Sequence, residues 1–284
     1  MDKESSSAQS NGKIFDVQAS QHHHYDEPLF PQIRISPEYL PDGRRSLSGI
    51  SRNAFGLGIA LGLTSLLTIQ LLYAGHYLWR LPFFISTLSI FHFLEFDMTA
   101  RFNPPDAKVS SFLLFNNGRA YNIAHSAAVT EIVIRYTLNS YGYLRLTSLP
   151  ALSFSPLDGL SISIPVSLGV VFILVGQTFR SLAMKQAGTS FNHMVQSSKK
   201  EDHVLITTGV YSLSRHPAYF GFFWWGLGTQ LVLGNFICFL AYAAILWKFF
   251  AHRIMHEEKH LVNFFGNAYE QYRKSTRVLI PFIS

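Results

Sequence analysis

Long apolar stretches separated by short polar ones dominate the chain after residue 48. Six of them are predicted to be membrane-spanning helices: Gly49–Trp79, Leu81–Phe96, Tyr121–Leu138, Leu160–Leu182, Tyr219–Leu233 and Phe236–Phe250. A helix needs about 20 mainly apolar residues to cross a bilayer, and several of these stretches meet or approach that length. The pattern therefore predicts an all-α polytopic membrane protein with about six transmembrane helices.

The last two apolar stretches are predicted to form a tight helical hairpin, because only Gly234 and Asn235 separate them. Ala218, Gly221 and Gly228 fall on one stripe of the first hairpin helix. Small residues on such a stripe let two helix backbones approach closely in a membrane. We therefore expect the hairpin to pack tightly against a neighbouring helix.

Polar segments divide the chain into three parts. Residues 1–48 are rich in Ser, Gln, Asp and His, and are predicted to be a disordered cytosolic tail. Residues 49–184 contain the first four predicted helices. Residues 185–284 combine a polar loop, the hairpin and a C-terminal polar and aromatic tail.

Composition supports a membrane protein and gives its charge a simple cause. Only 14% of the residues are charged, against roughly 25% in a typical soluble domain. The formal charge of +6 comes from Lys and Arg that flank the apolar stretches, so it does not indicate nucleic acid binding. Most of these basic residues fall on the side of the N-terminus, which predicts that both termini are cytosolic. The single cysteine, Cys238, allows no disulfide within the chain.

Polar residues at the start of the hairpin are candidates for a functional site. Arg215 and His216 precede Pro217, a residue that suits the first position of a helix. Arg215 is explained by anchoring at the membrane surface, whereas His216 and Tyr219 are explained less well in that way. Arg253 and Glu257, at the far end of the hairpin, are spaced to lie on one helix face. Glu131 and Arg135 have the same spacing and are expected to form a structural ion pair.

The segment His256-Glu257-Glu258-Lys259-His260 matches the H-E-x-x-H pattern of zinc hydrolases. In that interpretation His256 and His260 bind zinc and Glu257 activates a water molecule. The two charged middle positions and the absence of an evident third ligand downstream weaken it.

The C-terminal third resembles the protein-S-isoprenylcysteine carboxyl O-methyltransferase family. The residues that carry this resemblance occur in family order and spacing: Ser190-Phe191-Asn192-His193 with Gln196, Gly209-Val210-Tyr211, Arg215-His216-Pro217-Ala218-Tyr219-Phe220-Gly221, Gly228-Thr229-Gln230, Arg253 with Glu257-Glu258 and Leu261, Phe264-Phe265-Gly266-Asn267-Ala268-Tyr269 with Tyr272, and Ile280-Pro281-Phe282. The earlier helices resemble the family only in being apolar.

This resemblance implies that residues 185–284 form a catalytic module whose cofactor-binding region is cytosolic. The implied cofactor is S-adenosyl-L-methionine. Its implied binding residues are Gln196, His203, Val204, Leu205, Ile206, Tyr211, His216, Pro217, Ala218, Tyr219 and Glu257. Arg253 is the implied catalytic and substrate-binding residue.

The implied reaction is methylation of the C-terminal carboxylate of a prenylated cysteine in the endoplasmic reticulum membrane. The implied partners are C-terminally prenylated proteins such as small GTPases, together with membrane lipid. The helices are implied to offer the prenyl chain an apolar path between them. A carboxylate is already nucleophilic at neutral pH, so neither a general base nor a metal is required. The alternatives are a related membrane methyltransferase or sterol-reductase-like enzyme that shares the C-terminal module, the zinc hydrolase and a non-enzymatic scaffold.

Overall fold

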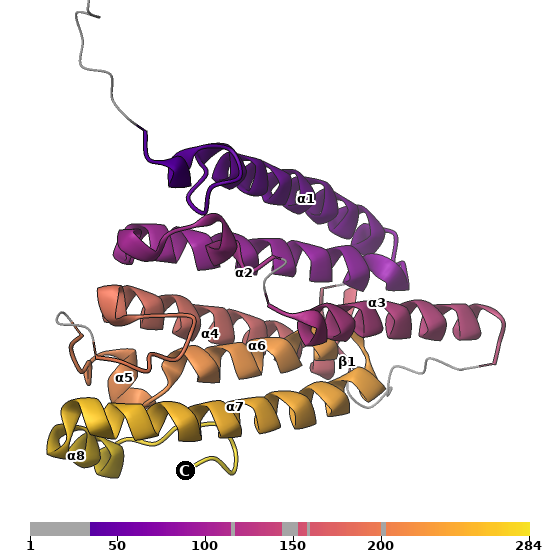
Figure 1. The fold of residues 1–284 in the computed structure, drawn as a ribbon. Helices are drawn as coiled ribbons and strands as arrows, with labels where there is room; N and C mark the ends of the chain where they lie inside the picture. Colours follow the sequence, from indigo (N-terminus) through magenta and orange to yellow (C-terminus); the bar gives the residue numbers. More distant parts are fainter. Residues whose placement is uncertain (1–34, 115–116, 144–152, 158–159, 200–202) are drawn as a thin grey trace, which may run out of the picture. The chain divides into compact units, whose positions relative to one another are not determined.

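The computed structural model describes residues 35–114, 117–143, 153–157, 160–199 and 203–284. Residues 36–284 belong to one compact unit, and Figure 1 shows its elements. The helices, in chain order, are α1 (Leu47–Tyr73), α2 (Arg80–Phe102), α3 (Arg119–Ser140), α4 (Ile164–Ala187), α5 (Val210–Leu213), α6 (Pro217–Leu233), α7 (Phe236–Phe265) and α8 (Asn267–Ser275). Two short strands, β1 (Ser153–Leu157) and β2 (Leu160–Ser163), pair antiparallel.

Each of the six predicted membrane stretches corresponds to a long helix. Among the described residues, four helical stretches are long and apolar enough to cross a membrane: Leu47–Tyr73, Tyr77–Phe102, Ile164–Ser190 and Phe236–Phe265. The other two long helices are α3, which is less apolar, and α6, which has 17 residues. The chain is therefore a helical protein with four candidate membrane spans, and a count of six spans stays a prediction.

The structure adds two features to the predicted organisation. The β1–β2 hairpin lies between α3 and α4, and the fourth long helix begins at Ile164 rather than at the predicted Leu160 because Leu160–Ser163 form β2. Part of the predicted N-terminal tail is also structured. Residues Pro37–Tyr39 form a 3-10 helix, and the Ser46 side chain caps α1 by accepting a hydrogen bond from the Gly49 N–H. Residues 1–34, the rest of that tail, lie outside the described residues.

Helix α7 is much longer than its apolar part. Its apolar sequence ends near Phe250, but the helix continues to Phe265 and buries Ile254 and Glu258 on one face. The continuation is amphipathic, so hydropathy alone did not predict it. As a result, Arg253 and Glu257 are held on a rigid helix that extends from the hairpin.

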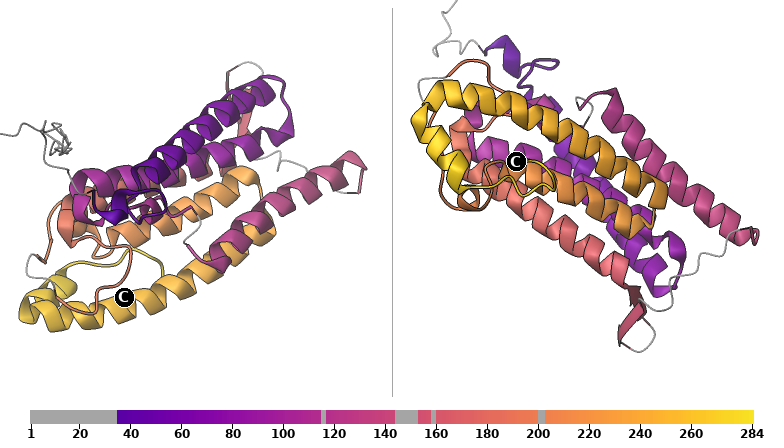
Figure 2. Two further views of the ribbon diagram at one scale, coloured as in Figure 1. Left: turned by 45° about the horizontal axis from the view of Figure 1, so that its top comes forward. Right: turned by 90° about the horizontal axis from the view of Figure 1, so that it is seen from below.

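Helices α4 and α6 run antiparallel in direct backbone contact, and Figures 1 and 2 show them side by side. Gly176 lies against Gly221, and Gly169 lies against Gly228. A Cβ atom added at Gly176 would come within 2.5 Å of the Gly221 carbonyl oxygen, and one at Gly169 within 2.8 Å of the Gly228 oxygen. The predicted small-residue stripe of α6 therefore packs on α4 rather than on its hairpin partner α7.

Polar contacts next to the turn between α6 and α7 fix where α7 begins. The expected pair of Glu131 with Arg135 is replaced by a helix cap: the Glu131 carboxylate accepts hydrogen bonds from the N–H groups of Ile237 (3.0 Å) and Cys238 (2.7 Å). These N–H groups have no partner within α7, and a carboxylate also interacts favourably with the positive end of the helix dipole. This cap attaches α3 to the turn at Gly234 and Asn235.

The glycine contact gives a stability prediction. We expect Gly176→Ala to lower the melting temperature of the detergent-solubilised protein, because overpacking of this kind costs about 1–3 kcal/mol. The control is Gly56→Ala in α1, since a Cβ atom at Gly56 meets nothing within 4 Å. In both variants alanine also replaces a glycine of lower helix propensity, so this effect is the same in the two proteins. Equal melting temperatures for the two variants would contradict the close contact.

Candidate functional site

One cavity gathers most of the residues that the sequence singled out. It is open to solvent and lies between the segment after α4, the start of α6, and the polar parts of α7 and α8. The predicted cofactor-binding residues that line it are His203, Val204, Leu205, Ile206, Tyr211, His216, Pro217, Ala218, Tyr219 and Glu257. Gln196 is half-buried and does not line this cavity, so its contact with a cofactor stays a prediction.

The start of α6 forms one wall of the cavity. Pro217 occupies the first helical position and His216 is the N-cap residue, which agrees with the helix start predicted from the proline. The His216 ring stacks on the Tyr219 ring with centroids 5.5 Å apart, and the Tyr219 ring stacks in turn on Phe250 of α7 at 5.2 Å. This stack fixes the wall against α7.

Tyr219 connects the two polar residues of α7 that were predicted to share a helix face. Arg253 Nε donates to the Tyr219 hydroxyl oxygen at 2.8 Å, and this hydroxyl donates to Glu257 Oε2 at 2.5 Å. The Arg253 guanidinium also lies 5.3 Å from the centre of the Tyr219 ring. Arg253 therefore adjoins the cavity through Tyr219, although it is not itself a lining residue.

Arg215 is buried rather than placed at the surface as an anchor. Only 7% of it is exposed, and its Nε donates to Glu258 Oε1 at 2.9 Å. Its Nη1 donates to the backbone oxygens of Thr276 (2.5 Å) and Arg273 (3.2 Å). The expectation of a membrane-surface anchor is thus corrected: Arg215 holds the C-terminal tail against the start of α6 and α7. Its Nη2 is buried without a hydrogen-bond partner among the described residues.

Two tyrosines hold α5 in place beside the cavity. The Tyr211 hydroxyl donates to the Ala183 carbonyl oxygen at 3.3 Å, and the Tyr272 hydroxyl donates to the Tyr211 carbonyl oxygen at 2.5 Å. Burial raises the pKa of both hydroxyls above the usual value for tyrosine. Both groups therefore keep their protons at neutral pH and act as hydrogen-bond donors.

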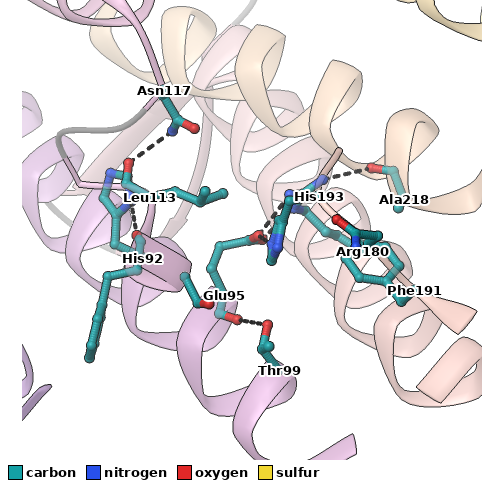
Figure 3. A network of polar contacts seen from close by, with 12 residues as sticks. His92, Glu95, Thr99, Leu113, Asn117, Arg180, Phe191, His193 and Ala218 are labelled. Atoms are coloured by element: carbon teal, nitrogen blue, oxygen red, sulfur yellow. Dashed lines mark hydrogen bonds and ion pairs between the residues drawn. The ribbon is translucent and has the colours of Figure 1, made fainter. Parts of the chain in front are cut away.

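A second polar network lies next to Arg253 and was not predicted from the sequence (Figure 3). It joins Glu95 of α2, Arg180 of α4 and His193 of the segment after α4. Glu95 has no exposed surface and Arg180 is 7% exposed. A charged residue inside an apolar stretch is an available signal for such a site. The sequence could not show which of the distant charges pair with one another.

The residues of the H-E-x-x-H pattern do not assemble as that pattern requires. His256 and His260 have ring centroids 4.8 Å apart, but Glu257 is engaged by the Tyr219 hydroxyl. Within the described ranges, no three His, Cys, Asp or Glu side chains lie together in a way that could hold a metal ion.

Known proteins resemble this chain along most of its length. A sequence profile of the isoprenylcysteine carboxyl methyltransferase (ICMT) family matches residues 168–263. The protein-S-isoprenylcysteine O-methyltransferase of Saccharomyces cerevisiae is 41% identical over 91% of this chain and 97% of the relative. The Homo sapiens protein of the same name is 35% identical over 82% of this chain and 75% of the relative.

A solved structure supports the same relationship at the level of the fold. The eukaryotic intramembrane Ras methyltransferase ICMT superposes with a TM-score of 0.65 at 32% identity, covering 78% of this chain and 74% of that one. The identity, the coverage and the superposition together show that the chain belongs to the isoprenylcysteine carboxyl methyltransferase family.

Proposed function

We propose that the chain transfers a methyl group from S-adenosyl-L-methionine to the C-terminal carboxylate of a prenylated cysteine, and that the methyl donor binds in the cavity beside Tyr219. The relatives named above are methyltransferases of isoprenylcysteine. The observation that carries the proposal is the meeting of the cavity-lining residues with Arg253 through the Tyr219 hydroxyl.

The lining of the cavity suits this cofactor. Apolar and aromatic side chains, including Leu205, Ile206 and Tyr211, offer surface for a purine ring. Glu257 supplies a carboxylate for a cationic group. Arg215 lines the same cavity, and its unpartnered buried Nη2 supplies a donor for an acceptor such as the cofactor carboxylate. When bound, S-adenosyl-L-methionine supplies an electrophilic methyl group.

Arg253 has one nitrogen left for a substrate. Its Nε and Nη2 donate to the Tyr219 hydroxyl and to the His193 carbonyl oxygen. Its Nη1 makes no hydrogen bond to a described residue and is not buried. A guanidinium keeps its charge at any physiological pH and holds a carboxylate by charge-assisted hydrogen bonds. Arg253 therefore orients the prenylcysteine carboxylate, while Tyr219 and His193 orient Arg253.

The residues around the site supply orientation rather than proton transfer. The substrate carboxylate is ionised at neutral pH and needs no general base. Arg253 is held beside the aromatic stack of His216, Tyr219 and Phe250, and this limits the directions from which that carboxylate can approach. Such orientation contributes up to about 7–11 kcal/mol in well-placed reactants. The rigid support of Arg253 therefore matters more for this reaction than a general base with a shifted pKa would.

The wider setting follows from the membrane helices and the family. We propose six spanning helices, with the shorter α3 and α6 completing the four candidate spans. The loop after α4, the start of α6 and the end of α7 meet at one end of the bundle, which we assign to the cytosolic face of the endoplasmic reticulum. Prenylated small GTPases would reach the site from that face, with the prenyl chain in the lipid.

Methyl transfer is tested with purified protein, methyl-labelled S-adenosyl-L-methionine and N-acetyl-S-farnesylcysteine. We expect the label to appear in a base-labile methyl ester, in equal amounts with and without a metal chelator. Absence of the ester would contradict the proposed function. Loss of the ester only when chelator is present would show that the methyl transfer requires a metal ion and would contradict the metal-free reaction proposed here.

The role of Arg253 is tested by Arg253→Ala with His252→Ala as its control. His252 is the preceding residue on α7 and is exposed. We expect Arg253→Ala to lower kcat/KM for the prenylcysteine by at least about 100-fold, because the carboxylate loses its orienting cation. Melting temperature and cofactor affinity should stay close to those of the wild type. Wild-type turnover by Arg253→Ala would show that Arg253 does not orient the substrate carboxylate.

The proposed orientation is tested by labelling single cysteines in sealed microsomes. In a Cys238→Ser background, Ser197→Cys places a thiol in the loop after α4, and Tyr141→Cys places one just after α3. Both positions are exposed. We expect a membrane-impermeant maleimide to label Ser197→Cys in intact vesicles and Tyr141→Cys only after permeabilisation. The reverse pattern would place the active site in the lumen.

A further inference from the structure

The Glu95 carboxylate lies at the centre of a buried network that joins three separate segments (Figure 3). Arg180 Nε donates to Glu95 Oε1, and Arg180 Nη2 donates to Oε2 at 2.7 Å. His193 Nε2 lies 2.9 Å from the same Oε2. A carboxylate oxygen accepts hydrogen bonds, so Nε2 carries the proton that His193 donates. The Glu95 carboxylate thus accepts hydrogen bonds from both the Arg180 guanidinium and the His193 imidazole.

Hydrogen bonds connect this network both to Arg253 and to the cavity wall at Ala218. The His193 carbonyl oxygen accepts a hydrogen bond from Arg253 Nη2 at 2.5 Å. On the other side, Arg180 Nη1 donates to the carbonyl oxygen of Ala218, which belongs to the cavity wall, at 3.3 Å. The Glu95 carboxylate is therefore two contacts away from the guanidinium that we assign to the substrate.

The segment that carries His193 depends on side-chain anchors for its position. It follows the 3-10 turn Gly188–Ser190 and has no helix or strand of its own. Its anchors include the Asn103 side chain, which donates to the Phe191 carbonyl oxygen at 3.0 Å, and the His193 contact to Glu95. Without the latter contact, no regular backbone hydrogen bonding would hold the His193 carbonyl oxygen opposite Arg253.

The contacts of His193 include one that the pair of Glu95 with Arg180 does not supply. The pair of Glu95 with Arg180 already joins α2 to α4, and it already compensates the burial of both charges. The imidazole adds a further hydrogen bond to a carboxylate that already has a charged partner. Its hydrogen bond to Glu95 also fixes the position of the His193 carbonyl oxygen, which accepts a hydrogen bond from Arg253. Loss of Glu95 would leave Arg180 buried without its partner and would cost stability, so His193 is the residue at which the two roles can be separated.

We infer that His193 is a positioning residue: held by Glu95 through its imidazole, it uses its backbone oxygen to aim Arg253 at the prenylcysteine carboxylate. The inference rests on the proposed function, in which Arg253 binds that carboxylate. It assigns His193 no contact with the substrate. It also gives the buried Glu95 a role in the reaction, exerted through two intervening residues.

The experiment compares His193→Ala with His193→Gln, whose side-chain amide can still donate to Glu95, and with His252→Ala as the control. For each variant we measure the melting temperature, the affinity for S-adenosyl-L-homocysteine, and kcat and KM for N-acetyl-S-farnesylcysteine. We expect His193→Ala to lower kcat/KM by about 10–100-fold, the range for a misplaced reacting group. The melting temperature and the affinity for S-adenosyl-L-homocysteine should barely change. His193→Gln should recover most of the lost kcat/KM.

Wild-type kcat/KM in His193→Ala would overturn the inference, as would a His193→Gln variant that is as impaired as His193→Ala. A loss of activity that only follows the loss of folded protein would assign His193 a structural role instead. Failure of the proposed function is recognised separately, because the wild-type protein would then form no methyl ester at all.

Discussion

The site depends on the close approach of α4 and α6, whose backbones touch at Gly176 and Gly221 and again at Gly169 and Gly228. Lipid offers no hydrophobic force to hold two helices together, so close packing has to provide much of the attraction. Because the two helices run antiparallel, the end of α4 meets the start of α6. The segment after α4 and the wall from His216 to Tyr219 consequently lie next to each other, and the cavity forms between them.

The long α7 helix completes this arrangement by carrying charged groups beyond the apolar bundle. Tyr219 joins the two parts, because its hydroxyl accepts from Arg253 and donates to Glu257. An ion pair within one exposed helix would be worth little. A hydroxyl between the two charged groups instead fixes each of them relative to α6. The wall proposed to bind the cofactor and the arginine proposed to bind the substrate are thus parts of a single packed unit.

The sequence predicted the positions of the long helices well because hydropathy is a local signal. Hydropathy located all six long helices. The residues implied to bind the cofactor line one cavity, with the exception of Gln196, and their contact with a cofactor stays a prediction. The partners of buried charges could not be predicted in the same way. Glu131 was matched with Arg135 on its own helix, whereas it caps α7 in the fold.

Contacts between distant segments explain the other differences. Arg215 looked like a surface anchor because its partner Glu258 is 43 positions away, and helical spacing does not reveal such pairs. Glu95 and Arg180 are 85 positions apart and belong to two different apolar stretches. The extent of α7 was missed because its last turns are stabilised by an amphipathic face packed on the C-terminal tail rather than by apolar composition.

The central claim is that Arg253, supported by Tyr219 and His193, recognises the free carboxylate of a prenylated cysteine. It is tested most directly by comparing the KM of N-acetyl-S-farnesylcysteine with the inhibition constants of its two neutral derivatives, the C-terminal amide and the methyl ester, in the wild type and in Arg253→Ala. The account predicts that the wild type prefers the charged carboxylate over both neutral compounds and that Arg253→Ala loses this preference. An undiminished preference for the carboxylate in Arg253→Ala would contradict it.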